Sequence, residues 1–191
     1  MKDKFYNELL DRLEQASNLS GGALRQEMGD MVETFTDEIW NFLCKKYPYV
    51  NAEIKKGPID PITIVDKDGN CITESVDRHC YINNNLVLAI ECKTYLDKCF
   101  MQRADSDFHL MKTSNNFDAI IVAFENAAAE NTFNFFMNQG NIDNVYFLAS
   151  SRRNSSRHIS RNKDNIKKDL VGNFIAKLES YFINTTASNP S

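Results

Sequence analysis

Long hydrophobic runs are absent from this sequence of 191 residues, and no apolar stretch follows its first few residues. A membrane-spanning helix needs about 20 consecutive apolar residues, and a secretory signal needs about 7–15 of them behind a basic start. We therefore expect a soluble, cytoplasmic protein without membrane contact. The apolar content of 42% is enough to bury a core, and the length predicts a single domain over residues 1–191.

The sequence also lacks the cysteine and histidine spacings that bind zinc. Its five cysteines include no C-x₂-C pair, and its three histidines include no pair separated by three to five residues. Five is moreover an odd number. We interpret the cysteines as reduced, mostly buried small hydrophobic residues, as is usual inside cells: Cys44, Cys71, Cys80, Cys92 and Cys99.

Positive charge is scarce overall but concentrated in one segment. The formal net charge is −4, with 22 Lys and Arg against 26 Asp and Glu. Residues 152–168 hold seven basic side chains and one acid, Asp164, so this segment carries +6 and the rest of the chain carries −10. The asymmetry indicates a local contact with a polyanion, and the alternative is a solvated charged loop that leads into a helix.

The spacing of apolar residues alternates along the chain between helical and strand-like patterns. A 3.6-residue period predicts helices, and apolar runs between turn signals predict strands. The predicted helices are residues 4–16, 23–46, 97–112, 130–138 and 164–182, and the predicted strands are residues 58–64, 75–82, 86–93, 119–124 and 145–149. This order predicts an α/β fold with a mixed central sheet of about five strands flanked by helices. Residues 1–22 would be an N-terminal helix and connection, and residues 185–191 a flexible tail.

Two charged side chains, Glu91 and Lys93, end the most apolar of the predicted strands. Residues 86–90 are continuously apolar, as expected of a central strand covered on both faces. Side chains alternate along a strand, so Glu91 and Lys93 share one face and Cys92 points to the other. Burying charge is costly unless the charge is paired or bound to a metal, so this pair calls for an explanation.

A predicted hairpin turn places a second carboxylate beside Glu91. Asparagine tolerates positive φ, so the triplet Asn83–Asn85 predicts a tight connection between two strands. If Asn84 is at the centre of the turn, Asp77 lies opposite Glu91 on the same face, with Cβ atoms about 4.5–5.5 Å apart. Two carboxylates this close repel each other unless a cation lies between them, and all-oxygen ligands favour Mg²⁺. The alternative is a simple Glu–Lys ion pair at a sheet end, with Asp77 on the surface near a turn.

Val76-Asp77, followed fourteen residues later by Glu91-Cys92-Lys93 within this order of helices and strands, resembles the PD-(D/E)XK nuclease superfamily. In particular it resembles type II restriction endonucleases. The stretch from Glu91 to Lys98 is closer to restriction enzymes of the Bpu10I type than to repair or recombination nucleases. Val76 stands where the motif has its proline, a frequent variation, and the resemblance covers roughly residues 23–149.

The resemblance implies a restriction-endonuclease-like core and Mg²⁺-dependent hydrolysis of double-stranded DNA at a specific short sequence, leaving 5′-phosphates. By this resemblance Asp77 and Glu91 would ligate Mg²⁺ together with the backbone carbonyl of Cys92. Lys93 would orient or deprotonate the attacking water. A member that cuts a palindrome would be a homodimer, because two-fold DNA symmetry calls for two matching sites.

Many members of the superfamily also place a glutamate of the first core helix near the metal. Two residues could do so here, Glu33 and Glu27. We prefer Glu33, because Gly29, one turn earlier, would let the helix approach the sheet or the DNA closely. The alternative is that Glu33 is an ordinary solvated helical glutamate.

Basic residues outside the motif are candidates for DNA contacts. Arg152, Arg153 and Arg157 follow a predicted strand among Ser and Asn residues, and we expect them to recognise the target, with phosphate anchoring as the alternative. Arg103 lies on the helix after the active-site strand, where family members often contact DNA, although surface charges are common there. Lys55 is a candidate phosphate contact.

Other functions remain open at this level. Within the nuclease class, a structure-specific or repair nuclease competes with a restriction enzyme. In a different class, the chain would be a non-catalytic DNA-binding subunit of a heteromeric complex. An unrelated α/β protein with a fortuitous ion pair would bind no divalent metal near Glu91.

Overall fold

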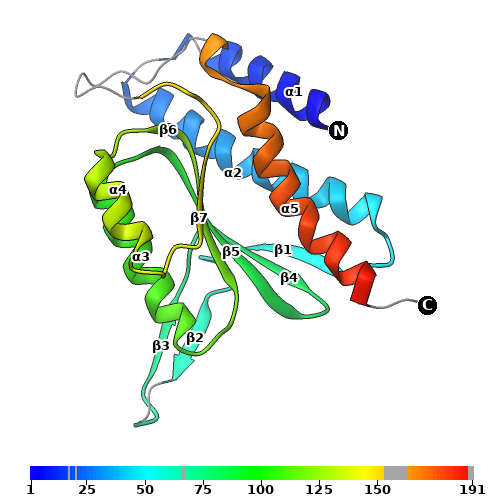
Figure 1. Cartoon of the computed structure of the whole chain (residues 1–191), viewed down its shortest axis with the longest axis vertical. Helices are drawn as coiled ribbons and strands as arrows, with labels where there is room; N and C mark the ends of the chain where they lie inside the picture. The colour runs from blue at the N-terminus through cyan, green and yellow to red at the C-terminus, as the bar shows by residue number, and fades with distance from the viewer. Residues whose placement is uncertain (17, 20, 66–67, 153–162, 189–191) are drawn as a thin grey trace.

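The middle of the molecule is a five-stranded mixed sheet with helices on both faces, seen in a computed structural model of the chain (Figure 1). The structure describes residues 1–16, 18–19, 21–65, 68–152 and 163–188. The strands, in sheet order, are β1 (Ala52–Lys56), β4 (Arg78–Ile82), β5 (Asn85–Leu96), β6 (Asp118–Asn126) and β7 (Asn144–Phe147). β4 is antiparallel to β1 and β5, whereas β5, β6 and β7 are parallel to one another. The predicted fold, a mixed sheet of five strands flanked by helices, is confirmed.

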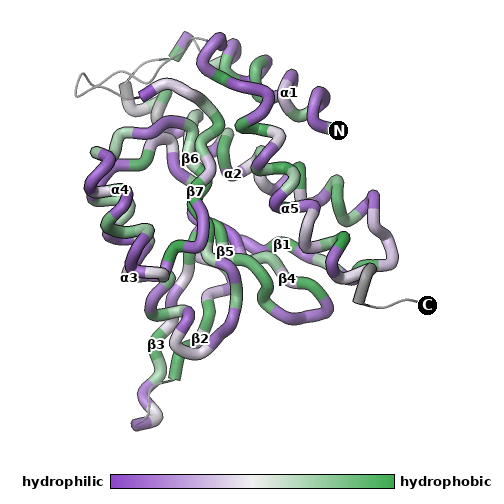
Figure 2. The backbone as a smooth tube through the Cα atoms, in the orientation of Figure 1, coloured by the Kyte–Doolittle hydropathy of each residue, from purple (hydrophilic) through white to green (hydrophobic). Residues whose placement is uncertain are grey.

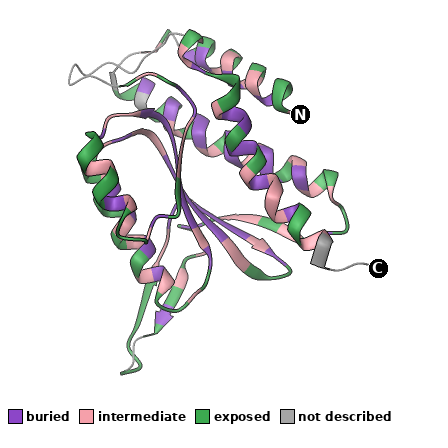
Figure 3. Cartoon of the chain, viewed as in Figure 1, coloured by how far each residue is buried: buried purple, intermediate pink, exposed green. Residues whose placement is uncertain are grey.

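The helices form a layer on each face of the sheet. One face carries α1 (Lys2–Ala16), α2 (Gly21–Lys46) and α5 (Lys168–Ser188), and the other carries α3 (Lys98–Lys112) and α4 (Glu130–Met137). Each layer buries its own apolar cluster against the sheet, and Figure 3 shows buried positions of α2 and α5 alternating with exposed ones. Within the described part of the chain, no helix is both long and apolar enough to cross a bilayer.

β5 lies at the centre of the sheet and is covered on both faces, as its continuous apolar run predicts. Leu88 and Ile90 pack into the cluster beneath α2 and α5, and Ala89 packs into the cluster beneath α3. All three side chains are fully buried. The tube in Figure 2 is correspondingly hydrophobic where β5 crosses the middle of the sheet. Any charged side chain on the second half of β5 therefore has to find its partners within the protein.

The prediction for residues 58–64 is wrong in its boundaries and in its place in the sheet. The edge strand of the main sheet is instead β1, and the chain then forms β2 (Ile62–Val65), which pairs with β3 (Cys71–Glu74) in a separate two-stranded sheet. β1 escaped detection because three of its five residues, in the sequence Ala-Glu-Ile-Lys-Lys, are charged. An edge strand of this kind forms because it pairs with a neighbouring strand, and its own sequence need not contain an apolar run.

Two further expectations are corrected by the structure. All five cysteines are free thiols as expected, but only Cys80 and Cys92 are buried, whereas Cys71 and Cys99 are exposed. Residues 185–188 are not a tail, because α5 continues to Ser188; the last three residues lie outside the described part. The helix extends because Phe182 is fully buried and anchors its last turns.

Asp118 at the start of β6 links α5 to the sheet through side-chain hydrogen bonds, and we expect its substitution to lower the free energy of unfolding. Lys177 donates to its Oδ2 at 2.7 Å, and the Tyr181 hydroxyl donates to the same oxygen. Burial alone would raise the pKa of Asp118, but these two bonds outweigh it and lower the pKa. Asp118→Asn should lose about 1 kcal/mol in urea unfolding at neutral pH, since the site is partly exposed.

The pH dependence follows from the sign of that shift. A carboxyl whose pKa is lowered by folding contributes stability above its unfolded pKa of about 3.9, and the contribution is lost as the pH falls through the folded value. The difference between wild type and Asp118→Asn should therefore shrink below about pH 4. An equal difference at pH 7 and pH 3 would contradict this assignment.

Candidate active site

The turn between β4 and β5 consists of Asn83 and Asn84, whose φ angles of 52° and 63° suit a two-residue type I′ hairpin. The pairing next to the turn is therefore centred between these residues and not on Asn84, which corrects the prediction. Val87 is an extra residue in β5 that forms a bulge opposite the junction of Cys80 and Tyr81 and shifts the register by one residue. Beyond the bulge the pairs have the predicted register.

Asp77 immediately precedes β4 and lies beside Glu91. The last pair of the ladder is Arg78 with Ile90, so one further step brings Asp77 and Glu91 together. The backbone N–H of Asp77 donates to Glu91 Oε2 at 3.2 Å. Conversely, the backbone N–H of Cys92 donates to Asp77 Oδ2 at 2.7 Å. These two bonds hold both carboxylates at the same end of the hairpin.

Lys93 completes the cluster that the sequence predicts. Its Nζ lies 2.5 Å from Glu91 Oε1 and 3.4 Å from Asp77 Oδ2. The same ammonium group lies over the ring of Phe100, 5.6 Å from its centroid. The structure thus brings Asp77, Glu91 and Lys93 into direct contact, with one cation shared by two carboxylates.

The charges of this cluster are strongly influenced by burial. Glu91 is only 4% exposed, and burial is the main reason that its pKa is raised; Lys93 lowers the pKa and Asp77 raises it again. For Lys93, burial lowers the pKa, but Glu91 and Asp77 more than offset this, so its pKa is raised and the side chain is an ammonium. With both carboxylates ionised, the cluster carries a net negative charge that a bound cation would neutralise.

The Cys92 side chain points away from the cluster, as strand alternation predicts. Its Sγ lies 3.8 Å from the Thr36 hydroxyl of α2, and both residues are buried. Burial raises the pKa of the Cys92 thiol well above its ordinary value, so the thiol is chemically inert. Any role of Cys92 at the site therefore belongs to its backbone.

A second polar cluster on the α2 face was not found from the sequence. Arg78, the residue after Asp77, is 2% exposed and makes two bonds to Asp37, Nε to Oδ1 at 2.5 Å and Nη2 to Oδ2 at 2.9 Å. Its Nη1 lies 3.1 Å from Glu33 Oε2 and donates to the backbone carbonyl of Asp77 at 2.8 Å. Glu33 thus reaches the site through Arg78. The sequence did offer one indication of this cluster. Arg78 follows Asp77 in a predicted strand, so its side chain points to the opposite, helix-covered face, where a buried charge needs a partner.

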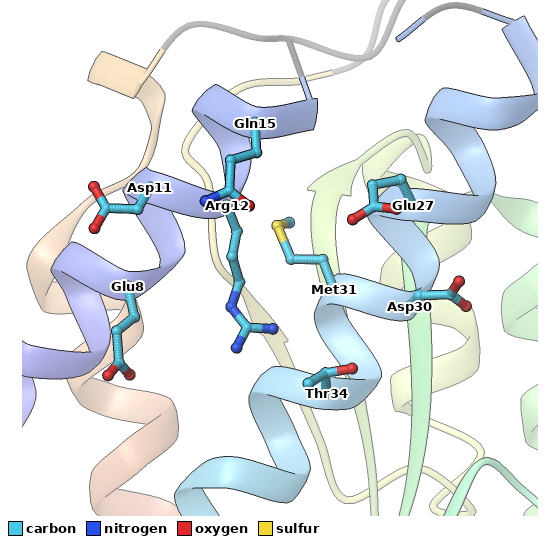
Figure 4. Close-up of a pocket in the computed structure, with 8 residues that line it drawn as sticks. All are labelled: Glu8, Asp11, Arg12, Gln15, Glu27, Asp30, Met31 and Thr34. Atoms are coloured by element: carbon cyan, nitrogen blue, oxygen red, sulfur yellow. The ribbon is translucent and has the colours of Figure 1, made fainter. Parts of the chain in front are cut away.

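The alternative helix carboxylate, Glu27, lies elsewhere. It is exposed and lines a groove of about 350 Å³ between α1 and α2, together with Arg12 and Asp30 (Figure 4). Gly29 does bring α2 close to β5, since a Cβ there would lie 3.6 Å from the Thr94 hydroxyl. That is an ordinary contact distance, so the close approach does not require glycine at this position.

On the other face, α3 brings a further acid toward the cluster. Burial raises the pKa of Asp107, Glu74 raises it further, and the charges of Arg103 and Lys93 lower it. Arg103 is 73% exposed and pairs with Asp107 at 3.6 Å. This exposure leaves Arg103 free to meet a ligand from solvent.

The other predicted DNA contacts are only partly described. Arg152 is exposed and donates to the carbonyl of Ala128 at 3.0 Å, whereas Arg153 and Arg157 lie outside the described residues. Lys55, on the edge strand β1, pairs with Asp60 at 2.9 Å and with Glu53 at 3.4 Å. A phosphate would have to compete with two carboxylates for this lysine.

The two carboxylates of the cluster are a donor set that Mg²⁺ can use when water and phosphate oxygens complete its coordination. Nowhere in the described ranges do three or more His, Cys, Asp or Glu side chains come together in a group that could hold a metal ion. Mg²⁺, however, is commonly bound by one or two carboxylates and keeps several waters, with phosphate oxygens of the substrate completing its shell. Asp77 and Glu91 provide that pair, and they share a face with Lys93.

The five-stranded mixed sheet flanked by helices is consistent with a restriction-endonuclease-like core, and Asp77, Glu91 and Lys93 lie together where the chain enters β4 beside the second half of β5. No family model matches the chain. A segment of 39 residues is 49% identical to part of the type II restriction enzyme DdeI of Desulfomicrobium norvegicum. This segment is 20% of the present chain and 16% of that enzyme, so the chain spans only a small part of its curated relative.

Proposed function

We propose that this chain is a Mg²⁺-dependent endonuclease of the PD-(D/E)XK type that hydrolyses double-stranded DNA at a specific short sequence and leaves 5′-phosphates. The observation that carries the proposal is the contact of Asp77, immediately before β4, with Glu91 in the second half of β5, and the position of Lys93 against both carboxylates. An ion pair alone needs one carboxylate. Two carboxylates that share a single ammonium group leave a negative charge that an additional cation would neutralise.

Asp77 and Glu91 would hold Mg²⁺, together with the backbone carbonyl of Cys92. The ion supplies Lewis acidity at the phosphate and a lowered pKa of bound water. Lys93 lies on the same face, and its raised pKa keeps it charged near neutral pH. It is therefore suited to orienting the attacking water and holding a non-bridging phosphate oxygen, more than to removing a proton.

Sequence specificity is proposed from the local similarity to a type II restriction enzyme and from basic residues outside the cluster. Arg103 is an exposed cation on α3, and Arg152 is an exposed cation in the segment that follows β7. We propose that they contact the DNA together with Arg153 and Arg157. Arginine can bond guanine in two places at once, which phosphate anchoring does not require. A palindromic target would be cut by a homodimer, because each strand then meets its own site.

The experiment is digestion of plasmid and phage DNA by the purified chain with Mg²⁺, and with a chelator as the control. Discrete bands whose ends, once sequenced, share one short motif with 5′-phosphates are the expected result. A smear, or cuts only at junctions and flaps, would point to a repair or structure-specific nuclease. Binding of DNA without any cleavage in Mg²⁺ or Mn²⁺ would indicate a non-catalytic subunit and reject the proposal.

A further inference from the structure

Arg78 lies between the candidate metal site and helix α2 and is held on both sides. It is one of the few charged side chains in the described structure that are almost fully buried, at 2% exposure. Asp37 binds its guanidinium through two parallel bonds of 2.5 and 2.9 Å. This fork-to-carboxylate geometry fixes the plane of the guanidinium, which a single contact would not do.

The fixed guanidinium is bonded directly to the peptide of Asp77. Nη1 donates to the Asp77 carbonyl at 2.8 Å, and the N–H of Gly57 donates to the same oxygen at 3.2 Å. On the other side of that residue, the Asp77 carboxylate accepts from the Cys92 N–H. The main chain of Asp77 is thus anchored by α2 through Arg78, while its carboxylate is aimed at the second half of β5.

Glu33 belongs to the same arrangement. Its Oε2 lies 3.1 Å from Nη1, the nitrogen that also bonds the Asp77 carbonyl. Glu33 therefore lies on the α2 face of β4 and contacts the Asp77 main chain only through Arg78. Lys93 and Glu91 lie on the opposite face, which α3 covers. Two acids on α2 flank one arginine, so each of the three guanidinium nitrogens has a partner.

We propose that Arg78 is a positioning residue that sets the orientation of Asp77 for metal binding, and that Glu33 acts through Arg78. This inference rests on the proposed function and deepens it. It assigns the carboxylate of α2 to the support of a ligand and not to the metal itself. Partners of this kind commonly change metal affinity or activity by about 10–100-fold when they are removed.

The test is Arg78→Lys, which keeps the buried positive charge opposite Asp37 and Glu33. A single ammonium group cannot reproduce the two-bond fork and reach the Asp77 carbonyl in the same geometry. We expect kcat for DNA cleavage to fall about 10–100-fold, and the Mg²⁺ concentration for half-maximal activity to rise. KM for DNA should stay within about twofold of wild type, because Arg78 is almost fully buried beneath the protein surface.

Glu33 is tested by a double-mutant cycle. If Glu33 acts through Arg78, Glu33→Ala lowers kcat in the wild-type background but adds nothing in the Arg78→Lys background. If Glu33 binds the metal itself, the two losses multiply. Multiplying losses would overturn the assignment of Glu33, and an unchanged kcat and Mg²⁺ requirement in Arg78→Lys would overturn the assignment of Arg78.

Two further variants separate positioning from folding. Asp37→Asn leaves only one acceptor for the two-bond fork and does not touch Asp77, so it should also raise the Mg²⁺ requirement. Arg12→Lys is the matched control, because Arg12 pairs with Glu38 of α2 at 2.5 Å and has no bond to Asp77. It should leave both kcat and the Mg²⁺ requirement unchanged.

The failure of this inference can be told from failure of the proposed function. If the wild-type chain cuts no DNA with Mg²⁺, the proposed function falls and the inference falls with it. If the wild type cuts DNA but Arg78→Lys loses activity only in proportion to its loss of folded protein in thermal unfolding, Arg78 is merely structural. In that case only the inference is rejected.

Discussion

Asp77→Asn is expected to reduce Mg²⁺-dependent DNA cleavage about a thousandfold while leaving the fold intact. A catalytic metal contributes several kcal/mol, and about 1.4 kcal/mol corresponds to each factor of ten in rate. The amide has nearly the same shape as the carboxylate and keeps an oxygen that can accept the Cys92 N–H, now at 2.7 Å. What it loses is the negative charge that a divalent cation needs beside Glu91.

The stability of this variant distinguishes a functional site from a structural ion pair. Asp77 raises the pKa of Glu91, so neutralising Asp77 removes a repulsion and leaves the Lys93–Glu91 pair at 2.5 Å. The free energy of unfolding without metal should therefore be equal to or above that of wild type, as is common when active-site strain is relieved. Mn²⁺ binding, followed by calorimetry, should be lost together with cleavage.

Asp11→Asn is a suitable control, because Asp11 is an exposed acid of α1 in the groove of Figure 4. It should cleave DNA and bind Mn²⁺ as the wild type does. Cleavage by Asp77→Asn at the wild-type rate would show that the contact between Asp77 and Glu91 is not the metal site.

Gly57→Ala is expected to destabilise the protein by about 3 kcal/mol, through a clash that the surroundings cannot relieve. A Cβ at Gly57 would lie 1.8 Å from the backbone carbonyl of Val76 and 3.1 Å from the Nε2 of buried His79. The first neighbour is main chain, so the segment before β4 has to move. Because the Gly57 N–H also bonds the Asp77 carbonyl, cleavage should fall in the folded fraction as well.

Gly29→Ala is the matched control for this effect. Its Cβ would meet only the Thr94 hydroxyl at 3.6 Å, and Gly29 lies in the interior of α2. Alanine there should raise the free energy of unfolding by about 0.5–1 kcal/mol, since glycine is the poorer helix former. Urea unfolding of both variants tests the pair, and similar changes for the two glycines would contradict the packing described around Gly57.

The register of the site was predictable from the sequence because it depends on a local connection. Asparagines that accept positive φ join two strands over a short distance, and hydrophobic alternation restricts the pairing to few alternatives. The turn nevertheless uses Asn83 and Asn84 alone, and the bulge at Val87 restores the expected pairing. Two local deviations cancel here, and no sequence pattern predicted either of them.

The strands before the hairpin were harder to predict. β1 is short and rich in charge, and β2 and β3 form a small sheet of their own with exposed residues such as Val65 and Ile72. Their pairing is decided by neighbours distant in sequence, since β1 joins β4 some twenty residues later. Short strands of this kind carry little periodicity of their own.

The sequence by itself determined the α/β class, the central strand β5 and the contact of Asp77, Glu91 and Lys93, because all three follow from periodicity and one hairpin. Only the tertiary structure decided which residues support that contact from the α2 face of the sheet. Arg78 and Asp37 come from β4 and α2, separated by 41 residues, and no local pattern couples them. The packing of α2 on the sheet brings them together, and with them Glu33, whose place beside Arg78 rather than Glu91 could only be read from the fold.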